Sequence, residues 1–374
     1  MGVNSHGTHT ATTAAGNYDT PAEVPGLGVR GKVTGIAPAA RVAAYKACWH
    51  DGCWTSNTTA AVDKAVADGV DVISYSISGG LTTSTSMGAM FNAAKAGVFV
   101  SSGAGNCGQG TVGNTAPWIT TVARETDDTG YTSNLVLGDG RRFRHDKLQA
   151  AAPTAPLVDA GDVRKPDADA AQATLCAPGT LDPGKMKGKI VVCNRGGNLF
   201  FEDKVKAACS VALALANTAT SSQDFAHYVF GLPLIQLPHA DAKTVKEYAA
   251  GSGATGELVS ATAPVRAPQI TATSSGGPAP YSGGDLLKPG IAAPGRLVLA
   301  GTVPGGALGH PDRFGFMSGT SMATPHISGL AALPQSAPGL QPDHAARHPF
   351  RRTGGGHSRR GEVHPARRTG GLER

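Results

Sequence analysis

Three short stretches of the 374-residue chain combine residue types that support nucleophilic catalysis. Ser321 stands in "GTSMATPH" (319–326), and the small residues after it predict a buried helix with the serine at its N-terminus. A serine hydroxyl becomes a good nucleophile only when a base takes its proton, and His6 or His9 of "SHGTH" (5–9) could supply that base. Asn106 in "GAGNC" (103–107) could donate its side-chain amide to an oxyanion during acyl transfer.

Each of these residues also has a plainer interpretation when it is taken alone. A serine before a helix is most often an N-cap, although Pro325 inside the expected helix is unusual for that role. A lone histidine is most often a core or surface residue. An asparagine in a glycine-rich turn is most often only a turn residue. The chemical interpretation therefore depends on the three stretches occurring together.

Together, and in this order, "NSHGTH", "SGAGN" and "GTSMATPH" resemble the subtilisin-like serine proteases, the subtilase family or peptidase family S8. The resemblance covers about 1–135 and 266–333. It implies that the chain is a serine endopeptidase that hydrolyses peptide bonds through an acyl-enzyme on Ser321, with His6 as general base. Asn106 and the backbone N–H of Ser321 are then the oxyanion donors, and His9 is structural, packed near the serine helix.

The resemblance also implies a peptide or protein substrate that is bound in an extended conformation between two strand edges. Ala104 and Gly105 would line the pocket for the residue before the scissile bond. The residues expected to contact the substrate are Ser74, Tyr75, Ser76, Ile77 and Ser78 on one edge, and Gly103, Ala104 and Gly105 on the other.

The chain departs from the family pattern at its N-terminus, at Gly276 and in the tail after Leu333. The family's third catalytic residue is an aspartate well before the histidine, whereas only five residues precede His6 and none is acidic. We therefore expect a chain that is truncated at its N-terminus, and the alternative function is a catalytically impaired subtilase fragment that retains only peptide-binding surfaces. In addition, Gly276 stands where the family usually has an arginine.

The elements that must position these residues alternate between strand and helix patterns. Strands are predicted at 40–48, 70–78, 98–106 and 118–123, and helices at 55–69 and 85–97, each closed by a glycine. Strands separated by helices of this length indicate βαβ units and a parallel sheet. The predicted fold class is therefore α/β, a subtilisin-like parallel sheet flanked by helices.

The middle of the chain has a separate α/β pattern. It includes a hairpin turn at "LGDGRRF", a loop over 150–180, a strand over 186–196 and a helix running into a short strand over 201–217. This segment resembles the protease-associated (PA) domain that some subtilases carry as an insert. The predicted divisions are 1–136 (first catalytic part), 137–265 (PA-like insert), 266–333 (serine part) and 334–374 (basic tail).

The tail accounts for most of the positive charge. The chain has a formal net charge of +6, and 341–374 holds eight arginines and three acidic residues. The abrupt change near Leu333 to arginine, glycine, histidine and proline predicts a disordered or frame-shifted segment. The alternative is a genuine basic tail that binds nucleic acid or an acidic surface. We expect no nucleic-acid partner, and the oligomeric state is not predicted.

Cysteine usage and hydropathy bear on location and cofactors. Cys48–Cys53 and Cys176–Cys193 could be disulfides of a secreted protein, and scattered buried thiols are the equal alternative. No apolar run approaches the roughly 18 residues of a membrane-spanning helix, so no membrane association is predicted. No signal peptide is visible in the chain, and secretion is expected for the intact protein. No cofactor or metal site is predicted; a structural calcium ion is compatible with the resemblance, with no ligands assigned.

Overall fold

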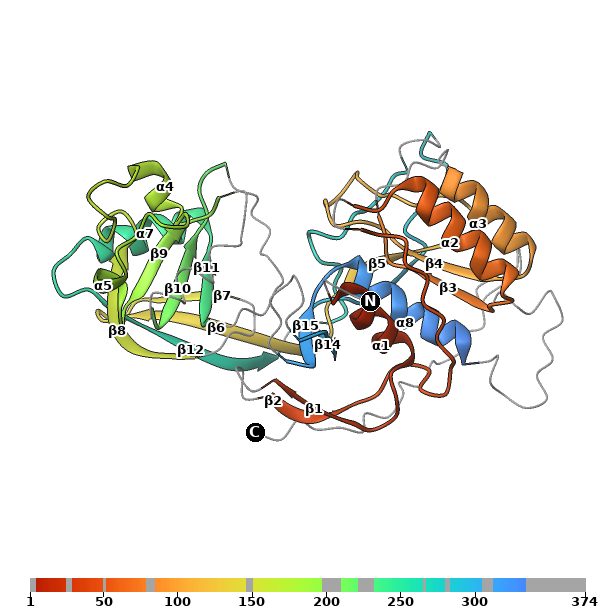
Figure 1. Ribbon diagram of the computed structural model, residues 1–374, viewed down its shortest axis with the longest axis horizontal. Helices are drawn as coiled ribbons and strands as arrows, with labels where there is room; N and C mark the ends of the chain where they lie inside the picture. The colour runs from red at the N-terminus through yellow and green to blue at the C-terminus, as the bar shows by residue number, and fades with distance from the viewer. Residues whose placement is uncertain are drawn as a thin grey trace.

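The computed structural model of the chain shows two lobes, of which one contains both ends of the described chain (Figure 1). The expected tail, 334–374, lies outside the described residues, which are 5–24, 29–49, 52–78, 85–145, 151–196, 210–220, 232–264, 267–279, 283–304 and 312–333.

The first lobe is built on a four-stranded sheet in which every neighbouring pair is parallel. Its strands, in spatial order, are β13 (Ile291–Pro294), β5 (Thr120–Glu125), β4 (Phe99–Gly103) and β3 (Val72–Tyr75). The helices of this lobe are α1 (His6–Ala15), α2 (Thr55–Ala67), α3 (Thr85–Lys95) and α8 (Thr320–Ala332). The structure thus confirms the predicted α/β class, a parallel sheet flanked by helices.

Alternation along β4 explains why both faces of the sheet carry helices. Val98 and Val100 lie in one apolar cluster with residues of α2 and α3, whereas Phe99 lies in another with Ala323 and Ile327 of α8. Successive side chains of a strand point to opposite faces, so a continuous apolar run needs cover on both sides. Figure 1 shows α2 and α3 on one side of the sheet and α8 on the other.

Two antiparallel hairpins complete this lobe. β1 (Thr20–Val24) pairs with β2 (Val29–Val33), and β14 (Val298–Gly301) pairs with β15 (Phe314–Met317). Val24, Leu297 and Phe316 form an apolar cluster between them. Because β15 ends three residues before α8, this hairpin determines where the helix that carries Ser321 begins.

The predicted strand at 40–48 is wrong. Its residues 41–48 form no strand, and 41–44 are exposed. Among the described residues β3 is an edge strand, and 41–48 do not pair with it, so this segment belongs to no ladder. The other predicted elements of the first lobe are present, and most are two to four residues shorter than predicted.

The second lobe contains a mixed sheet of seven strands in the order β11-β10-β9-β8-β12-β6-β7. The pairs among β8 to β11 are parallel, and the pairs that involve β12, β6 and β7 are antiparallel. The elements of this lobe are β6 (Thr129–Leu137), β7 (Arg142–His145), β8 (Ala152–Asp159), α4 (Ala170–Thr174), α5 (Pro183–Met186), β9 (Ile190–Asn194), β10 (Ala212–Ala216), β11 (Leu234–Leu237), α7 (His239–Ala249) and β12 (Thr255–Pro264).

The predictions for the second lobe had mixed outcomes. The hairpin turn is confirmed, since β6 and β7 join there, but the expected loop over 150–180 contains β8. The strand β6 begins at Thr129, before the division expected at 137, because it pairs with β12 along its whole length. The expected helix at 201–209 lies outside the described residues, and 212–216 form β10.

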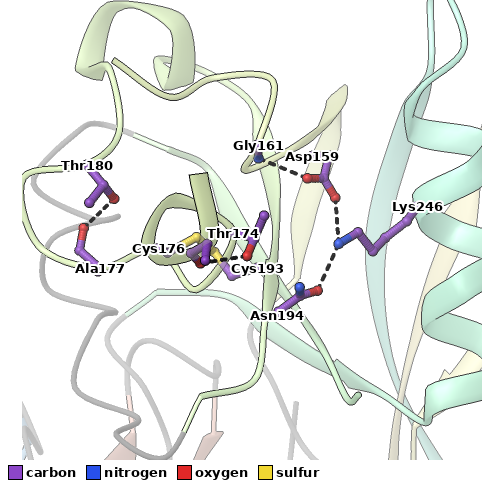
Figure 2. The surroundings of a disulfide bond; sticks show 10 residues. Asp159, Gly161, Thr174, Cys176, Ala177, Thr180, Cys193, Asn194 and Lys246 are labelled. Atoms are coloured by element: carbon purple, nitrogen blue, oxygen red, sulfur yellow. Dashed lines mark hydrogen bonds and ion pairs between the residues drawn. A yellow bond between two sulfur atoms is a disulfide. The ribbon is translucent and has the colours of Figure 1, made fainter. Parts of the chain in front are cut away.

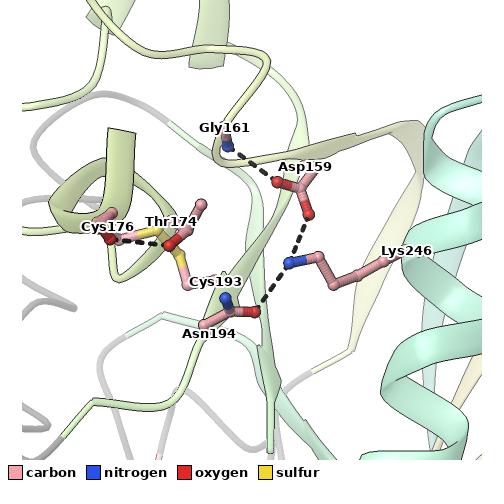
Figure 3. A network of polar contacts seen from close by, with 8 residues as sticks. Asp159, Gly161, Thr174, Cys176, Cys193, Asn194 and Lys246 are labelled. Atoms are coloured by element: carbon pink, nitrogen blue, oxygen red, sulfur yellow. Dashed lines mark hydrogen bonds and ion pairs between the residues drawn. A yellow bond between two sulfur atoms is a disulfide. The ribbon is translucent and has the colours of Figure 1, made fainter. Parts of the chain in front are cut away.

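Two disulfides are present, Cys48–Cys53 and Cys176–Cys193, and Cys107 is an exposed thiol. The second disulfide joins the loop after α4 to β9 (Figure 2). Beside it, the ammonium group of Lys246 lies 3.1 Å from Oδ2 of Asp159 and donates to Oδ1 of Asn194 at 2.8 Å, which links α7 to the ends of β8 and β9 (Figure 3). No helix among the described residues has the length and apolar character needed to cross a membrane.

Candidate active site

Ser321 is the second residue of α8, as the sequence predicted. The helix follows Gly319, and its first backbone N–H groups have no acceptor one turn earlier in the helix. The side chain is half-buried, with its neighbours Thr320 and Met322 fully buried. A positive helix terminus in such a setting favours negative charge that develops beside the serine.

A proline inside α8 changes the hydrogen bonding of Ser321. In a regular helix the N–H of residue 325 would bond to the carbonyl of residue 321, but Pro325 has no N–H. The hydroxyl of Ser76 donates to that carbonyl instead, at 2.8 Å. In return, Oγ of Ser321 donates to the carbonyl of Ser76 at 3.2 Å. The two serines are thus joined by a reciprocal pair of bonds.

Asn106 lies directly against the start of α8. Its Oδ1 accepts the backbone N–H of Thr320 at 2.9 Å, which identifies the other amide atom as the nitrogen. A Cβ built on Gly319 would lie 3.6 Å from Nδ2 of Asn106 and 3.6 Å from the backbone N of Ser321. Both donors therefore border the same space beside Gly319, and Oδ1 of Asn106 lies at the same distance of 3.6 Å from that Cβ.

His6 is the first residue of α1, and burial lowers its pKa below the ordinary value. The helix α1 packs closely on α8: a Cβ on Gly329 would lie 2.8 Å from the carbonyl O of Ala14 and 2.5 Å from Cβ of Ile36. The structure thus brings Asn106 and Ser76 to Ser321 and places His6 on the helix that packs against α8. A lowered pKa leaves the imidazole neutral near pH 7, as a general base must be.

His9 has the structural role expected of it, but through the β14–β15 hairpin. It is fully buried, and Nε2 lies 2.9 Å from the carbonyl O of Val298 and 3.2 Å from that of Gly315. A nitrogen between two carbonyls must carry the proton, so the tautomer is fixed. The side chain therefore joins α1 to both strands that lead into α8.

The segment 103–105, expected to be one of the two strand edges that bind the peptide, already uses most of its backbone hydrogen-bonding groups within the protein. Its carbonyl groups, and the N–H groups of Ala104 and Gly105, already hydrogen-bond within the protein. Their partners are the side chain of Asn114, the backbones of Val122 and Gly113, the side chain of Thr320 and the backbone of Ser275. These bonds leave the segment better suited to line a pocket than to pair with a peptide as a strand.

The segment 74–78 divides its side chains between the core and the site. Tyr75 is partly buried in the cluster with α2 and α3, and burial raises its pKa, whereas Ser74 and Ser78 are exposed. The backbone carbonyl of Ile77 accepts a hydrogen bond from the side-chain amide of Asn114 at 2.7 Å. Cβ of Ser78 would lie 3.8 Å from a Cβ on Gly105, so the two expected substrate segments face each other here.

Sequence reasoning missed Asn114, Thr320 and Ser275 as parts of this site. Oγ of Ser275 accepts the backbone N–H of Cys107 at 3.0 Å. The backbone φ of Gly105 is +109°, and a Cβ built on Gly105 would lie 2.8 Å from the same Oγ. Only glycine fits there without strain. The pair of serines before Gly276 was the available signal for Ser275, whereas nothing in "TVGNTAPW" distinguishes Asn114 from an ordinary turn residue.

Gly276 has a structural role of its own. A Cβ at this position would collide with the side-chain amide of Gln109. The backbone of Gly276 accepts the N–H of Gly110 at 2.9 Å and donates to the carbonyl of Gly108 at 3.1 Å. The loop after Asn106 is therefore held against 275–277. Within the part of the chain that the structure describes, no three His, Cys, Asp or Glu side chains cluster as metal ligands.

Known proteins are similar to this chain over most of its length. The sequence pattern of the subtilase family matches residues 1–354. The chain belongs to the subtilase family. Among curated subtilases, subtilisin-like protease SBT1.6 of Arabidopsis thaliana is 39% identical over 363 residues, covering 90% of this chain and 46% of the relative. Subtilisin-like protease SBT1.7 of the same plant is 38% identical over 355 residues, covering 89% and 46%.

This subtilase chain thus spans about half the length of the curated relatives it matches. Among solved structures, Sphericase aligns with 92% of this chain and 67% of its own at 20% identity, with a TM-score of 0.41.

Proposed function

We propose that the chain carries the site of a serine endopeptidase that hydrolyses peptide bonds in protein or peptide substrates. The observation that carries the proposal is the convergence of Nδ2 of Asn106 and the N–H of Ser321 beside Gly319, at the N-terminus of the helix that presents the Ser321 hydroxyl. The names of the curated relatives support the same reaction.

The proposed reaction uses two side chains for proton transfer and attack, two N–H donors and a water molecule. His6 takes the proton from Oγ of Ser321 as that oxygen attacks the substrate carbonyl carbon. Asn106 and the N–H of Ser321 donate to the oxyanion that forms. His6 then gives the proton to the leaving amine, and the C–N bond breaks to leave an acyl-enzyme. Water, deprotonated by His6, attacks this ester, which releases the carboxylic acid and restores Ser321.

The second lobe would be a PA-like insert between the asparagine and serine blocks. The chain enters this lobe through β6 and leaves it through β12, and the two strands pair with each other. Such pairing is expected when one segment of chain is inserted between two parts of another domain. The two disulfides favour an oxidising, extracellular location for the whole protein.

A fluorophosphonate probe tests the nucleophile. We expect the probe to label the wild-type chain at Ser321, identified by peptide mass spectrometry, and Ser321→Ala to abolish the label. Ser252→Ala is the matched control, because Ser252 is an exposed serine in the other lobe. Asn106→Ala should slow peptide hydrolysis about 10²–10³-fold, as loss of an oxyanion donor does elsewhere.

Two results would contradict the proposal in different ways. Labelling of a serine other than Ser321 would show that the other serine is the nucleophile. Peptide binding without label or hydrolysis would favour the alternative, an impaired fragment that retains only peptide-binding surfaces.

A further inference from the structure

Asn114 lies in the loop between β4 and β5 and is almost wholly buried, with 1% of its surface exposed. Its backbone φ is +52°, a left-handed conformation that asparagine tolerates better than most residues. The hydroxyl of Thr121 donates to its backbone carbonyl at 2.6 Å. Both the conformation and this bond fix the direction in which the side chain leaves the loop.

The amide nitrogen of Asn114 donates to two carbonyls, those of Ile77 at 2.7 Å and Gly103 at 2.9 Å. Because both partners are carbonyl oxygens, the bonded amide atom must be the nitrogen. One side chain therefore joins the two segments, 76–78 and 103–105, that border the proposed substrate site.

The position of this link in the sheet is informative. The ladder between β3 and β4 runs from Val72–Phe99 to Tyr75–Ser102. Beyond it, Gly103 is paired with Val122 of β5, so the ladder no longer sets the distance from 103 to 77. The Asn114 amide bridges the two segments just past this end, where Ser78 faces Gly105. The amide therefore joins the two segments where the ladder does not.

The Asn114 side chain makes its bonds through the amide nitrogen. Oδ1 of Asn114 is buried and has no hydrogen-bond partner. Buried polar atoms are nearly always bonded, so an unbonded Oδ1 makes Asn114 costly to bury. Asn217 in the second lobe also leaves one amide atom unbonded, so what sets Asn114 apart is that its two bonds join 76–78 to 103–105.

We infer that Asn114 is a positioning residue that fixes the separation of 76–78 and 103–105, and through it the shape of the pocket for the residue before the scissile bond. This inference rests on the proposed function for its substrate class. Asn114 acts through the two backbone carbonyls that it holds.

Two variants test the inference. Asn114→Gly removes the bridge while suiting the positive φ, and Asn114→Asp keeps the shape but replaces the donor with an acceptor. The substrates are peptides that differ only in the residue before the scissile bond, alanine against phenylalanine. We expect both variants to change the ratio of the two kcat/KM values by about tenfold, because pocket fit is worth factors of this size. A ratio within twofold of wild type in a folded variant would overturn the inference.

A control separates this role from simple stabilisation. Asn217 is also a buried asparagine, 2% exposed, whose Oδ1 accepts from Gln236 in the second lobe. Asn217→Gly should lower the melting temperature and leave the ratio unchanged. A purely structural Asn114 would behave in the same way.

Binding measurements keep the test independent of turnover. The affinities of both peptides are measured by fluorescence anisotropy for Ser321→Ala and for the double variant with Asn114→Gly. If wild type is not labelled and does not hydrolyse peptides, the proposed function fails, but the affinity ratio still decides the role of Asn114. A ratio that does not change, or a Ser321→Ala chain that binds neither peptide, overturns the inference.

Discussion

At the scale of single residues, the bond from Ser76 to the carbonyl of Ser321 depends on Pro325. Ser76→Ala leaves that carbonyl without either a helical or a side-chain donor, so we expect the free energy of unfolding to fall by about 1–3 kcal/mol. In a Pro325→Ala background the restored N–H can bond to the same carbonyl, and the cost of Ser76→Ala should shrink. Urea denaturation of the four chains measures this cycle. Additive costs would show that the two positions do not share the carbonyl.

The burial of His6 sets the expected pH dependence. Only neutral His6 can accept a proton, and burial disfavours the charged form, so its pKa lies below the ordinary value of about 6.5. The rate of Ser321 labelling should therefore rise with pH through a midpoint below about 6.5 and stay high above it. Labelling rates between pH 4.5 and 8 give the midpoint, and His6→Ala should abolish the dependence. A midpoint above 6.5 would mean that a neighbouring charge, not burial, controls His6.

Residue types predicted part of this site and could not predict the rest. Ser321 and Asn106 stand in motifs whose local geometry, a helix start and a strand end, determines their position. The Ser76–Ser321 bonds and the Asn114 bridge depend on segments far apart in the chain, and the partners' residue numbers differ by 245 for Ser76 and Ser321 and by 37 for Ile77 and Asn114. Such contacts follow from the packing of the sheet against α8, which local sequence does not contain.

At the scale of elements, the crossing of α1 and α8 has no room for a side chain at Gly329. Gly329→Ala should improve helix propensity by about 0.5–1 kcal/mol, but overpacking typically costs about 1–3 kcal/mol, so a net loss of stability is expected. Gly88 in α3 is the matched control, because no atom lies within 4 Å of a Cβ built there. Gly88→Ala should stabilise the chain. Thermal unfolding of both variants tests the contrast, and equal shifts would mean that α1 and α8 separate easily.

Element prediction failed where a strand pattern lacked a partner. The segment 40–48 and β10 both have apolar runs, yet only β10 has neighbours on both sides, β9 and β11. A strand exists through its hydrogen-bonded neighbours, so composition alone could not separate the two cases.

At the scale of the molecule, the two lobes have separate cores. The two large clusters between Leu135 and Leu258 contain only residues of the second lobe, and the other four contain only residues of the first. Thr129 and Pro264 are paired neighbours at the junction. Replacing 130–263 by a short glycine linker should therefore leave a folded first lobe.

Circular dichroism shows whether this shortened chain folds, and fluorophosphonate labelling shows whether Ser321 remains reactive. We expect a cooperative thermal transition and labelling of Ser321 within about tenfold of the full chain, because loop closure between adjacent residues costs little. A chain without cooperative unfolding would show that the second lobe stabilises the first.

The pairing of β6 with β12 also affects how a gene for this protein can evolve. Because the chain leaves and re-enters the first lobe through adjacent residues, one insertion or deletion in a gene can add or remove the entire second lobe without reordering the parallel sheet. Lineages can then change the two lobes at different rates, with drift or selection in one leaving the other's core intact.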